Sequence, residues 1–459
     1  MLVIKGWKWL YVFIVIFTLL TDQIWRNWYN PEYPFQHDVD QYYSYCIAAW
    51  VKHDLSFQSL RDRGYWLVEM PDNKVVQRFT YGMALMYTPF FLMAHFFSQI
   101  FHLRFDGYTN VYGNFISIGT YFYVFMGFYF LRKALIKFYS EKIVAFVIFS
   151  LFMCTNLFYY TVGHGEMSHS YLFSIYGLYI YAVVSWYEKF KNKYLYLAMF
   201  LSGLATLIRP TDVVNILFFL LYNVYNGNTL LQKIKLFKVH FFSLLKGIIL
   251  FVLPFFLQTL YWKVYGGQWI IYTYGKEGFF WLDPKIKEVL LSYRSGILVY
   301  SPIIFLSIIG FLPLYLNKKK IFWSIFLIFT ISLYIVSCWW TWWFGGGFGY
   351  RAIIQFFAFL AFPMAELYDI VLNKWNFKLI KVNYFKNAIF SILVVIFCIN
   401  NLIRHYQYKI WVIHWDSMSK EAFWFSGWRI SFSEEDRKYL ESVYVHPDYE
   451  KALNGIRGY

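Results

Sequence analysis

Apolar runs close to the length of a membrane span recur along the whole chain, and short polar segments separate them. They cover residues 7–25, 110–131, 142–160, 168–187, 194–208, 211–226, 241–262, 296–316, 321–340, 351–371 and 386–403. A helix needs about 20 apolar residues to cross a hydrocarbon layer of about 30 Å. The pattern therefore predicts an all-α polytopic membrane protein with about eleven transmembrane helices.

Lysine and arginine gather in alternate loops between these runs. The basic segments are Lys5 to Lys8, Arg132 to Lys142, Lys189 to Lys193, Lys233 to Lys238, Lys318 to Lys320 and Lys374 to Lys386. Short cytoplasmic loops carry an excess of Lys and Arg, so we place these segments inside and the remaining loops outside. The N-terminal run lacks a small-x-small cleavage site, which predicts an uncleaved first helix.

One further apolar run, 82–103, does not fit this alternation. The loop after Trp25 is predicted outside and Arg132 to Lys142 inside, which requires an odd number of crossings between them. We therefore expect 82–103, which contains Pro89, His95 and His102, to be a re-entrant or interfacial part of the first outer loop, 25–108. Eleven crossings then leave the N-terminus inside. Residues 1–403 form the membrane domain, and 404–459 form a small tail on the outer face.

Composition supports the membrane class. Of the 459 residues, 59% are hydrophobic and only 15% are charged, against about a quarter in soluble domains. The net charge of +16 sits mainly in the short loops, so it reflects topology and not a nucleic-acid partner. No repeat of 20–50 residues supports a repeat-built transporter. The four cysteines have no paired spacing, which argues against a disulfide framework and a cysteine metal site.

The segment His37-Asp38-Val39-Asp40-Gln41-Tyr42-Tyr43 follows the first apolar run and concentrates acidic and aromatic groups at a membrane boundary. In extended chain Asp38 and Asp40 project to the same side, whereas in a helix they diverge. If they share a pocket, repulsion raises the pKa of one of them, and that carboxylate suits a general base. The alternative is an N-cap, because Asp before an apolar helix is ordinary.

A second polar segment, Gly163-His164-Gly165-Glu166-Met167-Ser168-His169, lies between two apolar runs. If a helix begins near Glu166, Glu166 and His169 share a face. Glu166 is also placed as a helix-capping residue would be. Two histidines and a glutamate can bind a divalent metal, but the spacing is no recognised ligand motif. The sequence predicts no other cofactor.

The segment Trp339-Trp340-Thr341-Trp342-Trp343-Phe344-Gly345-Gly346-Gly347-Phe348-Gly349-Tyr350-Arg351 precedes another apolar run. Tryptophans are common at membrane interfaces. Glycines in addition let the backbone approach a ligand, aromatic faces suit sugar rings, and Arg351 suits phosphate. We therefore take Trp342, Trp343 and Gly346 as candidate substrate-binding residues, with His37, Tyr42, Tyr43, His164 and His169. No nucleotide P-loop signature is present.

Three other outer arginines, Arg78, Arg209 and Arg294, lie next to apolar runs. Snorkelling at a helix end explains any one of them. They share the outer side with the carboxylates, so we take them, together with Arg351, as candidate phosphate-binding residues.

This arrangement resembles the GT-C superfamily of membrane glycosyltransferases, in particular its protein O-mannosyltransferase and lipid A aminoarabinose transferase-like branch. The resemblance covers about residues 1–360. It rests on the acidic motif at Asp38 and Asp40, on Arg78-Phe79-Thr80-Tyr81-Gly82, on Glu166 and on Leu204-Ala205-Thr206-Leu207-Ile208-Arg209-Pro210. This chain has Val39 between its acids, where relatives often show Asp-Glu.

The resemblance implies transfer of a sugar from a polyprenyl-phosphate donor to an acceptor hydroxyl of a protein, lipid or glycan. It implies a bacterial cytoplasmic membrane with the active site facing the periplasm, and catalytic roles for Asp38, Asp40 and Glu166. A lipid or oligosaccharide transporter is the main alternative, although polar residues lining a path within the helices are expected of it. The tryptophan-rich stretch is also similar to that of haem-handling membrane proteins, but it lacks their terminal Asp.

Overall fold

The computed structural model describes residues 8–25, 34–374 and 380–458, without the side chains of residues 23–25, 380 and 381. Four parts of the predictions lie outside the described residues. They are Lys5, residue 7 at the start of the run 7–25, residues 26–33 of the first outer loop, and residues 375–379 of the basic segment from Lys374 to Lys386. Within them, almost every element is helical, and β1 (Leu67–Met70) and β2 (Lys74–Gln77) are the two strands. The predicted all-α class is confirmed at this level.

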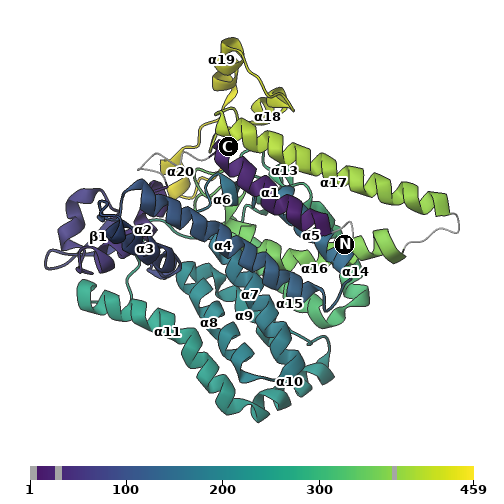
Figure 1. Ribbon diagram of the computed structural model, residues 1–459, viewed down its shortest axis with the longest axis horizontal. Coiled ribbons are helices and arrows are strands. Elements are labelled where there is room, and N and C mark those ends of the chain that lie inside the picture. The colour runs from purple at the N-terminus through teal and green to yellow at the C-terminus, as the bar shows by residue number, and fades with distance from the viewer. Residues whose placement is uncertain (1–7, 26–33, 375–379, 459) are drawn as a thin grey trace.

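Each predicted apolar run coincides with a helix or with consecutive helical segments. In chain order these are α1 (Lys8–Trp25), α4 (Asn110–Leu135), α5 (Glu141–Met153) with α6 (Tyr159–Val162), α7 (Ser168–Lys189), α8 (Asn192–Ile208), η2 (Pro210–Asn215) with α9 (Ile216–Leu221), α11 (Phe241–Gly266), α13 (Ile297–Tyr300) with α14 (Ile304–Asn317), α15 (Lys319–Cys338), η3 (Arg351–Phe356) with α16 (Phe357–Asp369) and η4 (Ile370–Lys374), and α17 (Ile380–Lys409). Figure 1 shows most of these helices gathered in one bundle.

Five helical segments of the described chain are long and apolar enough to cross a membrane. They are Asn110–Leu135, Phe241–Gly266, Lys319–Cys338, Arg351–Lys374 and Val382–Lys409. Pro210–Leu221 and Ile304–Asn317 are apolar but shorter. The molecule therefore has the features of a membrane protein, while helix length and apolarity alone account for five of the eleven predicted crossings.

Glycines allow the closest helix contacts in the bundle. A Cβ on Gly177 of α7 would lie 2.3 Å from the carbonyl oxygen of Gly127 on α4. Gly203 of α8 approaches α11 in the same way, and Gly310 of α14 approaches α16. Small residues let helix backbones meet where apolar lipid gives little drive for association. These contacts set how closely the helices of the bundle pack.

The first outer loop folds into α2 (His37–Trp50), η1 (Gln58–Arg63), the β1–β2 hairpin and α3 (Gly82–Ile100). The hairpin, which the sequence analysis did not foresee, turns through Asp72 and Asn73, both of which have positive φ as a tight antiparallel turn requires. α3 covers most of the run 82–103 and is not among the five candidate spans. Leu92, Met93 and Phe96 are exposed on it.

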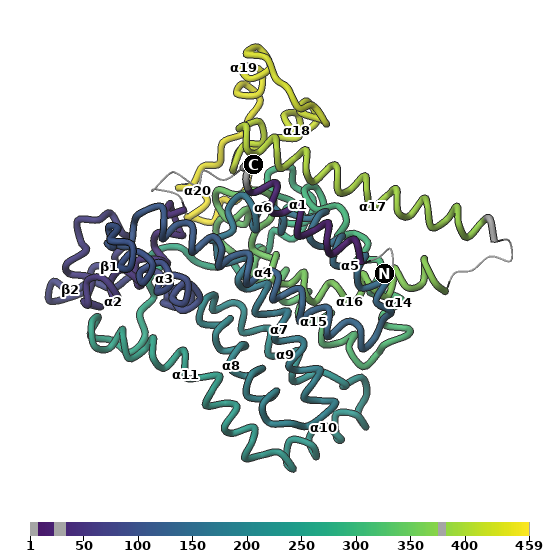
Figure 2. The backbone as a smooth tube through the Cα atoms, in the orientation of Figure 1, coloured from purple at the N-terminus to yellow at the C-terminus, as the bar shows by residue number. Residues whose placement is uncertain are grey.

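The remaining elements are α10 (Gly227–Val239), α12 (Ile286–Leu291) and the tail helices α18 (Lys420–Ser426), α19 (Glu434–Val443) and α20 (Tyr449–Leu453). The tail has a small apolar cluster that packs on Tyr300 and Phe348 of the preceding chain. In Figure 2, α2 and the hairpin lie at the left, whereas α10 lies at the bottom and the start of α17 lies at the right. The basic segments on α10 and α17 are thus distant from the acidic motif.

Candidate functional site

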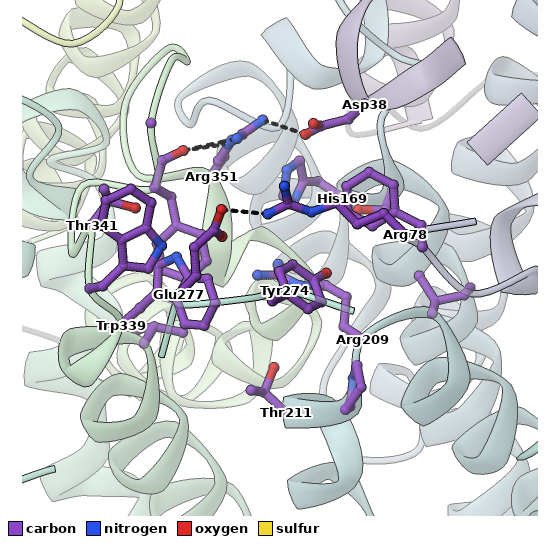
Figure 3. A pocket seen from close by; sticks show the side chains of 18 of the residues that line it. Asp38, Arg78, His169, Arg209, Thr211, Tyr274, Glu277, Trp339, Thr341 and Arg351 are labelled. Atoms are coloured by element: carbon purple, nitrogen blue, oxygen red, sulfur yellow. Dashed lines mark hydrogen bonds and ion pairs between the residues drawn. The ribbon is translucent and has the colours of Figure 1, made fainter. Parts of the chain in front are cut away.

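A cavity of about 340 Å³ lies at the end of the bundle that carries α2 and the hairpin (Figure 3). Six of the residues that the sequence predicts for the site line it: Asp38, Tyr42, Arg78, His169, Arg209 and Arg351. They come from α2, the segment after β2, the start of α7, the end of α8 and the start of η3. The fold therefore brings together side chains as far apart in the sequence as Asp38 and Arg351, which are separated by 313 residues.

Arg351 is held on one side by its own loop and faces Asp38 on the other. Its Nε and Nη2 donate to the carbonyl oxygen of Phe344 at 3.1 and 2.8 Å. Its Nη1 lies 3.4 Å from Asp38 Oδ2, longer than the usual 2.7–2.9 Å of a strong charged hydrogen bond. Gly347 makes room for this arrangement, because a Cβ there would lie 3.2 Å from Arg351 Cδ and 2.6 Å from the Tyr160 hydroxyl. Arg351 is thus fixed by a carbonyl and only loosely paired with Asp38.

Arg78 is neutralised by a residue that the sequence analysis missed. Its Nη2 lies 2.5 Å from Glu277 Oε1, and its guanidinium lies 5.0 Å from the centre of the Tyr274 ring. Figure 3 shows this pair close to the pair of Arg351 and Asp38. Glu277 lies between α11 and α12, in a loop that the alternation of basic loops also places outside. Its glycine neighbours, Gly275 and Gly278, were the available signal for a turn at this position.

Arg209 has no carboxylate within 4.0 Å in the part of the chain that the structure describes. Its Nη1 donates to the Ala352 carbonyl at 3.4 Å, and its guanidinium lies 5.5 Å from the centre of the Phe344 ring. Its extended backbone (φ −139°, ψ 108°) ends α8, as expected for a residue that precedes proline. Among the three cavity arginines it is therefore the one that retains most of its capacity to bind an anion.

His169 is buried in the cavity wall without hydrogen bonds from either ring nitrogen among the described residues. Its side chain is 4% exposed, and Tyr160 packs edge-on against its ring at 5.1 Å. Buried polar atoms normally have partners, and an unsatisfied one costs about 1–3 kcal/mol. A bound polar ligand provides a natural partner for this ring.

Aromatic rings form much of the remaining wall. They are Trp66, Phe79, Tyr272, Tyr274, Phe279, Trp339, Trp340, Phe344 and Tyr449. The sequence pointed to the tryptophan-rich stretch, but to a different part of it, since Trp342 and Trp343 lie outside the cavity. Gly345 also lines the cavity, has a positive φ of 63°, and has open space where a side chain would stand. Such a surface suits the face of a sugar ring.

Asp38 and Asp40 do not share a pocket, because α2 begins at His37 and successive residues of a helix diverge. Asp40 accepts a hydrogen bond from Tyr108 at 3.2 Å on the other face of α2. Burial raises the pKa of Asp40 to about 6, although Tyr108 and Arg63 lower it in part. The N-cap alternative is also wrong, since Gln36 occupies that position and makes no side-chain capping bond.

Glu166 is buried beside the cavity and not in its lining. Its Oε1 accepts from Ser117 Oγ at 2.5 Å, and its carbonyl accepts from Tyr87. Because α7 begins at Ser168, Glu166 precedes the helix and does not share its first turn with His169. Burial lowers the pKa of His164, and Glu166 partly opposes this. Within the described residues, the group that could hold a metal through three His, Cys, Asp or Glu side chains lies elsewhere, in the C-terminal tail.

The other predicted residues lie outside the cavity, and most of them contact protein. His37 is exposed, and Tyr43 donates to the Gly107 carbonyl at 2.6 Å. Arg294 is buried and donates to the carbonyls of Asp416 and Val445, with its guanidinium 5.1 Å from the centre of the Trp343 ring. Trp342 donates to the Arg457 carbonyl, and a Cβ on Gly346 would lie 2.8 Å from the Trp415 ring. Arg294, Trp342, Trp343 and Gly346 therefore contact the C-terminal tail.

Comparison with known proteins adds no relative to this description. The chain matches no model of a known protein family and no curated protein.

Proposed function

We propose that this protein is a GT-C-like glycosyltransferase that moves a sugar from a polyprenyl-phosphate donor to an acceptor hydroxyl at the outer face of the membrane. The observation that carries the proposal is the cavity in which Asp38 lies among Arg78, Arg209 and Arg351. A lipid-linked donor needs a site at the membrane boundary, and its phosphate needs cationic partners. The aromatic wall supplies a surface for the sugar.

The chemistry uses the two kinds of charge in the cavity. The acceptor hydroxyl attacks the anomeric carbon as Asp38 takes its proton, and the bond from that carbon to the phosphate oxygen breaks. The electron pair leaves with the phosphate, whose growing charge is stabilised by Arg209 and Arg351. A phosphate at Arg351 competes with Asp38 for the guanidinium. Donor binding thereby frees the carboxylate to act as a base.

The proposed topology has eleven crossings, with the N-terminus in the cytoplasm and the cavity facing outward, in a bacterial cytoplasmic membrane. It is supported by the separation of the basic segments on α10 and α17 from α2 and the hairpin (Figure 2). The four native cysteines are buried, so a single introduced cysteine is a clean reporter. In intact cells, Lys438→Cys on α19 should react with an impermeant maleimide, and Lys191→Cys should not. Equal labelling of both would contradict the topology.

Turnover of a lipid-linked sugar tests the activity directly. Purified protein in detergent is incubated with a radiolabelled polyprenyl-phosphate hexose or pentose, with and without cell-envelope acceptor, and polyprenyl phosphate is measured by thin-layer chromatography. We expect donor consumption in the wild type and a large loss in Asp38→Asn. Donor that stays intact for every sugar and acceptor tested would overturn the proposal.

A second cavity makes a lipid or oligosaccharide transporter the alternative. It has a volume of about 380 Å³ and is lined by residues such as Tyr187, Lys233 and Lys320, near the basic segments. A transporter would move lipid-linked sugar between the leaflets of a proteoliposome and leave the sugar–phosphate bond intact. The same donor, analysed by chromatography after incubation with proteoliposomes, separates the two functions.

A further inference from the structure

The C-terminal tail contains a cluster of two histidines and an aspartate that lies outside the cavity. His414 and Asp416 follow α17, and His446 lies between α19 and α20. One ligand atom of each, a ring nitrogen or a carboxylate oxygen, lies within 4.8 Å of the other two. These are the ligand types that zinc prefers, with bonds of about 2.0–2.2 Å that separate tetrahedral ligands by roughly 3.4 Å. To reach that separation, the ligand atoms must approach one another by up to about 1.4 Å.

The neighbouring hydrogen bonds prepare two of these side chains as ligands. Ser417 Oγ donates its single proton to Asp416 Oδ1 at 2.6 Å and contacts His446 Nδ1 at 2.9 Å. His446 must therefore donate from Nδ1, which leaves the lone pair on Nε2 available. Tyr449 donates to the other carboxylate oxygen at 2.6 Å. Such outer partners orient ligands at metal sites and fix the histidine tautomer.

His414 can supply the third ligand only by giving up hydrogen bonds that its Nδ1 accepts. Its Nδ1 lies 3.2 Å from Asp416 Oδ1, and the backbone N–H groups of Asp416 and Ser417 also donate to it. A metal at this nitrogen replaces those two hydrogen bonds. Three protein ligands, one of them the exposed His446, leave the fourth position of a tetrahedral ion to water.

We propose that His414, Asp416 and His446 form a zinc site that holds the tail in place beside the cavity. The site adds a metal link between the segment after α17 and the segment before α20, which already meet through the bond from the Val445 N–H to the Ser417 carbonyl and through the contact of Ser417 with His446. It also helps to position Tyr449, which lines the cavity and whose hydroxyl donates a hydrogen bond to Asp416. Because two amide hydrogen bonds are given up, we expect this site to bind zinc more weakly than a structural site whose ligands make no such bonds.

Metal analysis of the full-length protein tests this site. The protein is purified with a tag that contains no histidine, stripped with EDTA and titrated with zinc chloride in a calorimeter. We expect one zinc per chain in the wild type and at least a tenfold weaker affinity in His446→Asn. His53→Asn is the matched control, because His53 is also an exposed histidine and lies in the first outer loop. It should bind zinc as the wild type does.

Two further measurements decide the outcome where binding alone is ambiguous. X-ray absorption of the zinc-loaded protein should show nitrogen and oxygen ligands with two histidines. Zinc should slow proteolysis of the tail in the wild type and not in His446→Asn, and both proteins should keep the same melting temperature without zinc. Failure to bind zinc, equal binding in His446→Asn, or ligands other than two histidines would overturn the assignment.

Discussion

The cavity and the neighbouring contact between Arg294 and the C-terminal tail both use arginine, but in opposite ways. In the cavity, Arg209 makes one long hydrogen bond to a carbonyl, and Arg351 keeps one nitrogen facing Asp38. In the tail contact, Arg294 is buried and its two terminal nitrogens donate to main-chain carbonyls. Residue type is the same in both regions. Whether an arginine is available to a ligand depends on which carbonyls the fold places beside it.

The two carboxylates of α2 differ in a similar way. Asp38 lines the cavity and faces Arg351, whereas Asp40 is packed against Tyr108 near Arg63. Two positions along one helix thus separate a carboxylate that lines the cavity from one that does not. Substitution of Asp38 or Asp40, and of a cavity arginine or Arg294, therefore tests whether lining the cavity makes a residue functional.

We expect Asp38→Asn to cause the largest loss in the rate of sugar transfer. The amide keeps the shape and most hydrogen bonds of the carboxylate but removes its basicity, and loss of a general base typically costs about 10²–10⁴-fold in rate. Donor affinity should persist or rise, because Arg351 is released from Asp38. Transfer rate and donor affinity are measured in the same detergent preparation.

Asp40→Asn is the control for this prediction, because it makes the same chemical change on the other face of α2. It should retain transfer within about threefold of the wild type, since Asp40 does not line the cavity. Wild-type transfer in Asp38→Asn together with loss in Asp40→Asn would reverse the roles of the two residues.

The arginines should give the next largest effect. A charge-assisted hydrogen bond contributes about 1.5–3 kcal/mol, so Arg209→Ala or Arg351→Ala should lower kcat/KM by about tenfold to over a hundredfold. Arg351→Lys should rescue only part of this, because a lysine cannot reproduce the planar set of donors to Phe344 and a ligand. The measurement is initial transfer rate as donor concentration varies.

Arg294→Ala sharpens the comparison between the two regions. It leaves two tail carbonyls without their donors, so its effect should appear as a lower melting temperature and faster proteolysis of the tail. In the fraction that stays folded, donor affinity should match the wild type. A folded Arg294→Ala protein with specifically weakened donor binding would place this arginine in the site.

The sequence foretold the membrane class and the positions of the apolar helices because both follow from local hydrophobicity. It also predicted that Asp38, Arg78, Arg209 and Arg351 lie on one side of the membrane, and all four line the same cavity. The sequence did not indicate Glu277 as a site residue, because it lies in an irregular loop with no periodic pattern. Its position opposite Arg78 depends on how that loop returns to the hairpin.

Other candidate residues lie outside the cavity because of tertiary contacts that the sequence does not show. Trp342, Trp343 and Gly346 have the residue types of a sugar site, but the tail occupies their surface. The last 50 or so residues show no apolar run that would predict where they pack. Likewise, the start of α2 at His37 decides that Asp38 and Asp40 diverge, and segment boundaries are the least certain part of sequence reasoning.

A smaller effect is expected from Gly347→Ala, which acts on the cavity through Arg351. The added methyl would lie 2.6 Å from the Tyr160 hydroxyl and 3.2 Å from Arg351 Cδ, so one of them must move. A displaced rotamer costs about 0.5–1.5 kcal/mol, which predicts roughly a threefold to tenfold loss in kcat/KM. Gly278→Ala is the control, because its Cβ would meet no atom within 4 Å. Equal kinetics for the two variants would contradict a positioning role for Gly347.

The smallest effect concerns stability and belongs to Asp40. Burial raises its pKa from the ordinary 3.8 to about 6, so the folded protein keeps a proton between these pH values that the unfolded chain has released. Stability therefore falls as pH rises through this window and is level above it, by about 1–2 kcal/mol once partial exposure is considered. Asp40→Asn can still accept from Tyr108 but has no proton to lose, so its melting temperature at pH 7.5 should exceed that of the wild type by about 1–4 °C, with a smaller difference at pH 4.5. Asp62→Asn, which changes an exposed carboxylate on η1, should follow the wild type at both pH values, and a parallel pH response in all three proteins would show that Asp40 does not carry the proton.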